Sequence, residues 1–146
     1  ETIMRLQNEP MNVPEVLINL VDVFVIMRRY NIDGRIQRMV GELSETSGME
    51  QKMVLLSTLW SYDLPAHAFR ESGVSSVYRD RLAYISGHPS KDIMVELKLR
   101  ANIMKLFLDR NITNIVDITN FCRRYAVDAQ SAIESLGLKK EELLRW

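Results

Sequence analysis

Four arginines lie around one short turn in the first third of the sequence. Arg28 and Arg29 end a run of β-branched and aromatic residues, and Arg35 and Arg38 follow the Asn-Ile-Asp-Gly turn at residues 31–34. Asp-Gly between two such runs is a strong signal for a β-hairpin. Guanidinium groups bind carboxylates and phosphates through paired hydrogen bonds. The sequence therefore predicts a basic hairpin that either holds an anion or forms ion pairs within its own sheet.

Residues suited to metal binding, phosphate binding or nucleophilic catalysis are sparse in the rest of the chain. The six glycines never show the P-loop spacing, in which two glycines five positions apart precede Lys and Ser or Thr. His67 and His88 are the only histidines, and zinc needs three or four convergent ligands, so we expect both to be structural or surface residues. Cys122 follows Phe121 in a helical pattern, which favours a buried, inert thiol. We expect no catalytic and no metal-ligating residue.

Composition narrows the class of protein. The chain has 146 residues, is 47% hydrophobic and carries 19 basic and 19 acidic residues. This length holds one ordinary hydrophobic core, and the charge balance gives no overall attraction to nucleic acid or to anionic membranes. The longest apolar run, Val23 to Met27, is far shorter than the ~20 residues that cross a bilayer. Any function of the basic residues must therefore be local.

Hydrophobic patterns predict the elements that position these arginines. Helical segments over residues 1–6 and after Asn12 and Pro14 precede the strands. The apolar run at residues 23–27 is typical of a strand covered on both faces, and residues 35–43 of a strand with one solvated face. A third strand at residues 53–60 is set off by Ser47-Gly48, and residues 68–70 form a short fourth strand.

The pattern is helical from Ser75 or Ser76 to the end of the sequence. The first predicted helix ends at Gly87, and the second runs from Ser90 to about Arg110. A third starts at Thr113 or Asn114, a fourth runs from Asp128 to Gly137, and a last turn lies in residues 139–146. Four methionines are expected to fill gaps in the core, namely Met27, Met39, Met53 and Met104. The fold class is therefore α+β, with N-terminal helices, a small, largely antiparallel sheet with hairpins, and a C-terminal helical bundle.

Several short motifs together resemble the archaeal branch of the type II and type IV secretion ATPases, which includes the archaellum motor ATPase and proteins similar to type II secretion protein E. The family pattern is a helix of the form E-T-x-x-x-R-L-x-N-x-P, then N-V-P, a strand that ends in R-R, a basic hairpin, and a strand followed by Y-D. The matching residues here are Glu1-Thr2, Arg5-Leu6, Asn8, Pro10, residues 12–14, Asp22, Arg28-Arg29, residues 42–45 and residues 60–63, and the helical tail is similar over residues 84–138.

The resemblance implies a part in a hexameric machine. The family's ATPase consists of RecA-like domains, hydrolyses ATP with magnesium at subunit boundaries, and docks on a polytopic membrane platform protein at the cytoplasmic face of the cell membrane. Its Walker A, aspartate box, Walker B and histidine box are all missing from this sequence. The expectation is a C-terminal fragment without cofactor-binding residues, inactive alone. Residues 1–74 would complete the RecA-like core, and residues 75–146 would form a helical subdomain.

The hairpin arginines have two interpretations under this resemblance. Arg28 and Arg29 lie near a nucleotide or a subunit interface, or they pair with Glu42, Glu45 or Asp33 across the hairpin. Arg35 and Arg38 are expected to serve interaction with a partner. The unpaired edge of the Val23–Met27 strand also predicts self-association of the chain.

Two other classes of function remain open. A stand-alone adaptor would dock a partner through its helical half, and its sign would be an exposed apolar patch on the Ser90–Arg110 helix. A winged-helix-like module would place Arg35 and Arg38 on phosphates, but zero net charge and acidic neighbours disfavour it, so no nucleic-acid partner is expected.

Overall fold

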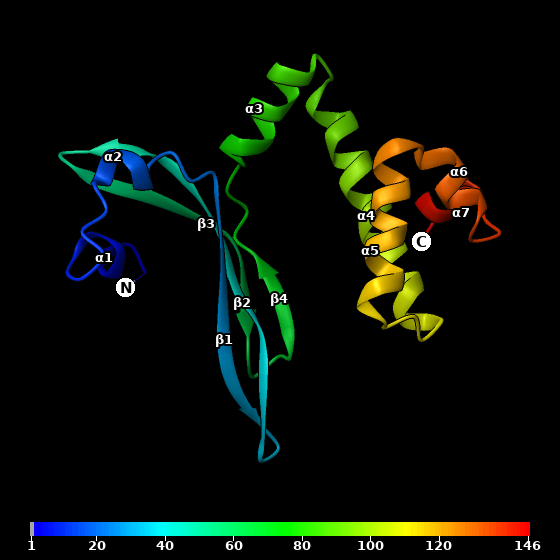
Figure 1. The fold of residues 1–146 in the computed structure, drawn as a ribbon, viewed down its shortest axis with the longest axis horizontal. Helices are drawn as coiled ribbons and strands as arrows, with labels where there is room; N and C mark the ends of the chain where they lie inside the picture. Colours follow the sequence, from blue (N-terminus) through cyan, green and yellow to red (C-terminus); the bar gives the residue numbers. More distant parts are fainter. Residues whose placement is uncertain (1) are drawn as a thin grey trace. The chain divides into compact units, whose positions relative to one another are not determined.

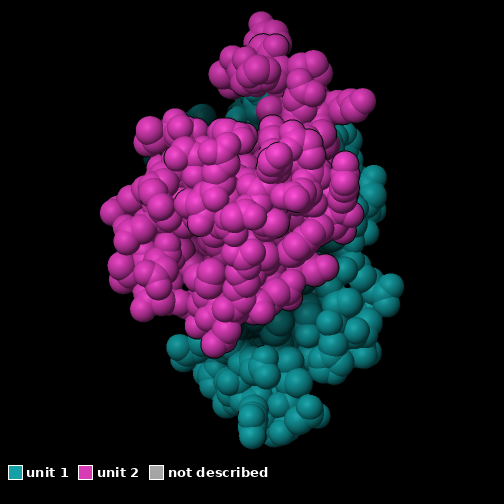
Figure 2. Space-filling view, turned by 90° about the vertical axis from the view of Figure 1, so that its right-hand side faces the viewer, with its two compact units in different colours: residues 1–82 teal, residues 83–146 magenta. Residues whose placement is uncertain are grey.

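The structure is a computed structural model that describes residues 2–146, so Glu1, the first residue of the family-like pattern, lies outside the described residues. The chain divides into two compact units, residues 1–82 and residues 83–146, which are coloured separately in Figure 2. The first unit holds two short helices and the sheet, and the second holds the helical bundle (Figure 1). The predicted α+β class with an antiparallel sheet is confirmed.

Four antiparallel strands form the sheet of the first unit. They are β1 (Val23–Ile32), β2 (Arg35–Glu50), β3 (Met53–Asp63) and β4 (Ala68–Glu71), in the order β1-β2-β3-β4. Asp33 and Gly34 connect β1 to β2 with φ of 51° and 76°, which confirms the predicted hairpin turn. Positive φ at both central residues matches the twist of the flanking strands.

The break between the second and third strands does not lie at Ser47-Gly48, the position that the sequence indicated. The turn lies at Gln51 and Lys52, both with positive φ, and β2 continues through Ser47-Gly48. The pairing of β2 with β3 shifts between Thr46 and Gly48, where Gly48 has φ of 128°. A glycine in such a conformation accommodates a β-bulge without ending the strand. Ser47-Gly48 therefore marks a bulge within β2 and not the end of the strand.

The apolar segment at the start of β1 is also less covered than predicted. Val25 and Met27 are 57% and 60% exposed, so the expectation of a strand covered on both faces is wrong. β1 is an edge strand of an antiparallel meander, a type of sheet that can leave one face solvated. Met53, the first residue of β3 beside the turn at Gln51 and Lys52, is also exposed, contrary to its predicted place in a core. The self-association expected from this edge stays a prediction.

Few side chains are buried in the first unit. Its helices, α1 (Thr2–Gln7) and α2 (Glu15–Ile18), are short, and among its described residues Ile18 is the only buried hydrophobic side chain. Its other fully buried side chains are polar, Ser44 and Glu45. Many apolar side chains remain exposed on its helices and sheet, among them Val16, Leu17, Leu20, Val25, Met27, Met49, Met53, Leu55, Leu56, Trp60 and Phe69.

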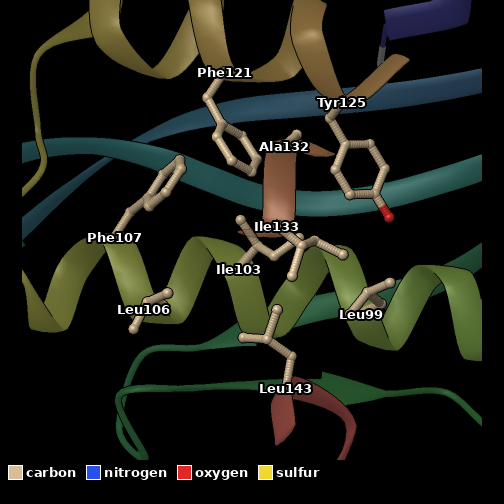
Figure 3. Packing of buried hydrophobic residues seen from close by; sticks show 9 residues of the cluster. All are labelled: Leu99, Ile103, Leu106, Phe107, Phe121, Tyr125, Ala132, Ile133 and Leu143. Carbon is tan, nitrogen blue, oxygen red and sulfur yellow. The ribbon is translucent and has the colours of Figure 1, made fainter. Parts of the chain in front are cut away.

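The second unit contains the main hydrophobic core. Its helices are the end of α3 (Val77–Ser86), α4 (Ser90–Asp109), α5 (Ile115–Val127), α6 (Ala129–Glu134) and α7 (Lys140–Leu144). Figure 3 shows the core side chains, in which Phe107 of α4 meets Phe121 of α5 edge to face at 4.9 Å. Asn114 and Asp128 cap α5 and α6 through their side chains, at positions where the sequence predicted helix starts. Ser90 is the first residue of α4, and the cap position before it is Pro89.

Two predicted core residues of the helical unit are exposed. Phe121 and Tyr125 lie one helical turn apart on the buried face of α5, and Cys122 is rotated away from that face, so its thiol is exposed. Met104 lies on the outer side of α4 and is 39% exposed. Among the described residues 2–146, no helix is long and apolar enough to span a bilayer.

Candidate functional site

A polar side-chain network lies on one face of the sheet, centred on Glu42. Ser44 Oγ donates to Glu42 Oε1 at 2.6 Å, and Thr58 Oγ1 donates to the same oxygen at 3.2 Å. Arg28 Nη2 approaches Glu42 Oε2 at 3.5 Å. Arg28 comes from β1, Glu42 and Ser44 from β2, and Thr58 from β3. The network therefore connects three strands.

Strand register explains why these side chains meet. Ser44 and Thr58 are direct partners across β2 and β3, and their hydroxyl oxygens are 3.1 Å apart. The pairing of β1 with β2 shifts after Ile26, which lies opposite Glu42, so that Met27 lies opposite Val40. The residue skipped by this shift is Gly41. Such a bulge redirects neighbouring side chains, which lets Arg28 reach Glu42 across the strands.

The environment of Glu42 favours its charged form. The hydrogen bond from Ser44 is the largest influence and lowers the pKa of the Glu42 carboxyl. Partial burial opposes this effect, while Thr58 and Arg28 lower the pKa further. A carboxylate that is ionised near neutral pH accepts hydrogen bonds and holds a cation, and it does not serve as a general acid. The network is therefore suited to binding or bracing.

A cavity of about 510 Å³ adjoins this network. Its sheet side includes Arg28, Glu42 and Ile26, and its helical side consists of residues of α1, including Arg5 and Leu6. The lining thus combines two cations, one carboxylate and apolar carbon, all within the first unit. Such a mixture is typical of a surface that receives a polar side chain of another protein segment or a small charged group.

Aromatic side chains flank Gly41 beside the network. Tyr30 and Tyr62 have ring centroids 5.2 Å apart, and Tyr62 meets Phe69 edge to face at 5.3 Å. A Cβ atom on Gly41 would lie 2.6 Å from Cδ of Arg28 and 2.7 Å from the hydroxyl of Tyr30. The absence of a side chain at Gly41 therefore allows Arg28 and Tyr30 to lie across β2.

We expect Gly41→Ala to displace Arg28 and to destabilise the sheet unit by about 1–3 kcal/mol, the usual cost of overpacking. The reason is the 2.6 Å approach between the added Cβ and the Arg28 side chain. Urea denaturation of Gly41→Ala, Arg28→Ala and the double variant measures the coupling of the two positions. The double variant should be more stable than the sum of the single effects predicts, and strict additivity would contradict this account.

Glu45 lies on the opposite face of β2 and fixes the start of α3. Its side chain is 0% exposed. It accepts hydrogen bonds from Ser76 Oγ at 2.8 Å, from the Val77 backbone N–H at 2.5 Å and from the Tyr78 backbone N–H at 3.2 Å. The first backbone N–H groups of a helix have no partner within the helix, and a carboxylate there is stabilised by the helix dipole. Glu45 is therefore the N-terminal cap of α3.

An ion pair also holds α3 to the sheet unit. Arg81 of α3 pairs with Asp22, the residue just before β1. Together with Glu45, this contact attaches the first part of α3 at two points. The last residues of α3, 83–86, belong to the second unit. The helix that leads from one unit to the other is thus anchored at its beginning.

The four hairpin arginines occupy different environments. Arg28 pairs with Glu42, whereas Glu45 is engaged by α3 and not by an arginine. Arg29 lies directly opposite Arg38, and Arg35 lies opposite Ile32. These three arginines are exposed and form no ion pair within 4 Å in the part of the chain that the structure describes. Like charges directly opposite one another are unfavourable, so an anionic partner at this hairpin would relieve a repulsion.

Sequence reasoning missed two parts of this site. Nothing in the local sequence links Glu45 to the start of α3, because the partners are more than thirty residues apart, although the start of this helix was expected at Ser75 or Ser76. Ser44 and Thr58 were also missed, since their pairing depends on the register of β2 and β3. Among residues 2–146, no group of three or more His, Cys, Asp or Glu is arranged to hold a metal ion.

We expect Ser44→Ala to raise the pKa of the Glu42 carboxyl towards its ordinary range. The folded protein lowers this pKa, so the stabilisation from Glu42 is fully present above the ordinary glutamate pKa of about 4.3 and is lost as pH falls through the folded value. NMR titration of the Glu42 carboxyl in both proteins tests this. A titration midpoint that Ser44→Ala leaves unchanged would show that the hydroxyl does not control the charge of Glu42.

The fold and the site together describe an α+β protein whose partly uncovered antiparallel sheet carries a basic hairpin and which has a second, helical unit. No family model matches its sequence. It is similar to three uncharacterized proteins of Methanocaldococcus jannaschii. MJ0781 is 22% identical over 138 residues, which are 93% of this chain and 19% of the relative.

The other two relatives show a comparable likeness. MJ0900 is 28% identical over 115 residues, 75% of this chain and 21% of the relative. MJ1287 is 28% identical over 105 residues, 70% of this chain and 38% of the relative. The chain thus spans about a fifth of the length of the first two relatives and under two fifths of the third.

Proposed function

We propose that the chain forms the C-terminal portion of an assembly ATPase of the secretion, type IV pilus or archaellum kind. In this proposal its sheet completes a RecA-like domain, and its helical unit passes on the movement that ATP hydrolysis produces. The chain itself holds neither the nucleotide nor the magnesium ion. The complete protein would work as a hexamer at the cytoplasmic face of the cell membrane, docked on a polytopic platform protein.

The observation that carries this proposal is the uncovered sheet unit. Among its described residues it buries a single hydrophobic side chain, Ile18, while Val25, Met27 and Leu56 remain exposed on the sheet. Exposed apolar patches of this kind mark surfaces that another protein layer covers. A RecA-like sheet has helices on both faces, so further parts of such a domain would cover these strands.

The anchored start of α3 supports the mechanical part of the proposal. Glu45 and Asp22 fix the first half of α3 to the sheet unit, and the helix continues into the second unit. A displacement of the sheet would therefore reach residues 83–86 through a helix, and residues 87–89 connect that helix to α4. Arg29, Arg35 and Arg38 supply positive charge for a neighbouring subunit or for a nucleotide held elsewhere.

The test uses the complete protein with Arg28→Ala and Arg29→Ala combined. Since Arg28 braces Glu42 and Arg29 has no ion pair among the described residues, the variant should lower ATP turnover or the fraction of hexamer. Arg123→Ala, at an exposed arginine of α5, is the matched control. Unchanged turnover and assembly would leave these arginines only a bracing role, whereas a complete protein that hydrolyses no ATP would overturn the proposed function itself.

A protein-interaction adaptor is the second candidate, and a specific observation favours it. An adaptor was expected to show an exposed apolar patch on α4, and the outer side of this helix carries one. It includes Leu97 at 52% and Leu108 at 71% exposure. The winged-helix alternative gains no comparable observation, because α1 and α2 are six and four residues long. Binding of a partner by the chain without any ATPase partner domain would distinguish the adaptor from the ATPase.

A further inference from the structure

The longest helix has two apolar faces. One face of α4 belongs to the core, with Leu99, Ile103, Leu106 and Phe107 buried. The other face is exposed, and its members recur at alternating intervals of three and four residues. We call this second face the α4 seam, and it consists of Met94, Leu97, Ala101, Met104 and Leu108.

The spacing of the α4 seam is that of a helix-docking surface. Intervals of three and four residues correspond to the a and d positions of a heptad, and here they persist from Met94 to Leu108. Side chains in such a row pack as knobs into holes of a facing helix. The seam is a narrow row, since Lys98 and Arg100 lie on either side of it. A single helix is the partner that matches this width.

A groove continues the α4 seam towards α5. A cavity of about 140 Å³ lies between the two helices, and Met104 lines it together with Cys122 and Ala126 of α5. Phe121 and Tyr125 also line it, so its walls are mainly apolar. Methionine side chains adapt to partners of different shape, and small residues such as Ala126 let another backbone approach. Met104 therefore belongs both to the seam and to this groove, whose lining also includes Arg100.

A row of lysines sets the charge that a partner must carry. Lys91, Lys98 and Lys105 are spaced seven residues apart, so all three lie along the same edge of the seam. They are exposed, and none forms an ion pair within 4 Å in the part of the chain that the structure describes. In heptad terms they occupy the e position, which contacts the flanking charges of the facing helix.

This charge pattern argues against a second copy as the occupant. Two α4 helices packed antiparallel would bring the lysine row of one copy against that of the other. Packed parallel, each lysine row would face the edge that contains Arg100, which already pairs with Glu96 at 2.8 Å, so this edge offers the lysines no free carboxylate. The antiparallel arrangement places like charges together, which costs binding energy and suppresses the wrong partner. An acidic helix has no such cost.

We propose that the α4 seam docks an amphipathic helix of another protein whose apolar row is flanked by glutamate or aspartate. The proposal concerns the second unit alone; it rests on the adaptor candidate, whose partner it specifies, and it does not depend on the ATPase proposal. An anionic lipid surface is the less suitable occupant, because helices that lie on membranes insert a wide apolar face, commonly with Trp or Phe. The seam has no aromatic member and is one row wide.

Two synthetic helical peptides of about three heptads test the proposal. Both have leucine at a and d; one has glutamate and the other lysine at e and g, which also keeps each peptide from pairing with itself. Fluorescence anisotropy with the chain should show saturable binding of the glutamate peptide and at least roughly tenfold weaker binding of the lysine peptide. Equal binding of the two peptides, or no binding of either, would overturn the proposal.

Variants of the chain make the test specific. Leu97→Glu should abolish binding of the glutamate peptide, whereas Val127→Glu, at an exposed residue of α5 that does not line the groove, should leave it unchanged. Replacing Lys91, Lys98 and Lys105 together by glutamate should reverse the preference to the lysine peptide. Circular dichroism confirms that each variant is folded. Loss of the preference without its reversal would contradict charge recognition at this edge.

Two further measurements assign the seam to a different occupant if the proposal fails. Tighter binding to phosphatidylcholine vesicles with roughly 30% phosphatidylserine than to the glutamate peptide would make the seam a membrane surface. Sedimentation that shows a dimer, which Leu97→Glu dissociates, would make the occupant a second copy. Each of these results overturns the acidic-helix proposal, and their absence together with the peptide preference supports it.

Discussion

Glu45→Ala is expected to destabilise the sheet unit by about 2–4 kcal/mol, the combined range for a lost helix cap and lost hydrogen bonds to a buried charge. Alanine removes the acceptor for Ser76 Oγ and for the backbone N–H groups of Val77 and Tyr78. These donors would then lie at the start of α3 without the partner that the fold supplies, and the side chain that fills this fully buried position would be gone. Urea denaturation followed by circular dichroism measures the loss.

Two other variants show which property of Glu45 matters. Glu45→Gln keeps the shape of the side chain but replaces one acceptor oxygen by a donor amide, so its effect should be intermediate. Glu50→Ala, at an exposed residue of the same strand, should change stability by less than about 0.5 kcal/mol. If Glu45→Ala were as mild as Glu50→Ala, the cap on α3 would not contribute to folding.

Loss of this cap should also release the start of α3. Hydrogen exchange of the Val77 and Tyr78 amides reports on this directly, since both donate to Glu45 in the folded protein. Faster exchange confined to the first turn of α3 would accompany the loss of stability. This local readout separates release of the helix from a general weakening of the sheet.

Phe107→Ala is expected to destabilise the helical unit by about 3–5 kcal/mol, the usual range for removing a buried aromatic side chain. Phe107 is 3% exposed and contacts Phe121 edge to face, a geometry that adds to the value of the buried area. Alanine leaves a cavity between α4 and α5 that the surrounding helices fill only in part. Thermal denaturation monitored at a helical wavelength measures the change.

The next residue along the chain is the matched control. Leu108 is 71% exposed, so Leu108→Ala should change stability by less than about 0.5 kcal/mol, although it belongs to the α4 seam. The same variant should weaken binding of the acidic helical peptide. Similar losses of stability from Phe107→Ala and Leu108→Ala would show that α4 is not oriented with one face in the core and one outside.

The basic hairpin was predictable because its signals are local. Asp33 and Gly34 adopt the positive φ values that their residue types favour, and the flanking residues pair across the turn as expected. Asn114 and Asp128 likewise begin helices through contacts only a few residues away. Each of these features depends on interactions within one turn, so the sequence alone determined them.

Exposure was the property that the sequence did not determine. Val25 and Met27 form a run typical of a covered strand, yet β1 is at the edge of an antiparallel sheet. Cys122 follows a core residue but faces solvent, because the direction of a helical side chain depends on which face its neighbours cover. The hydrophobicity of a side chain sets the free energy that its burial would contribute. Only the packing of the other elements decides whether the side chain is buried.

The roles of the acidic residues of β2 show the same division. The sequence determined that a basic hairpin with carboxylates close by along β2 would form, and one of the predicted pairs, Arg28 with Glu42, is present. Only the tertiary structure decided that Glu45 caps α3 instead of pairing with an arginine, and that Ser44 and Thr58 complete the site of Glu42. The reason is that a carboxylate binds whichever donors the fold brings within about 3 Å, and strand register and the path of α3 set those donors over sequence distances that no local pattern spans.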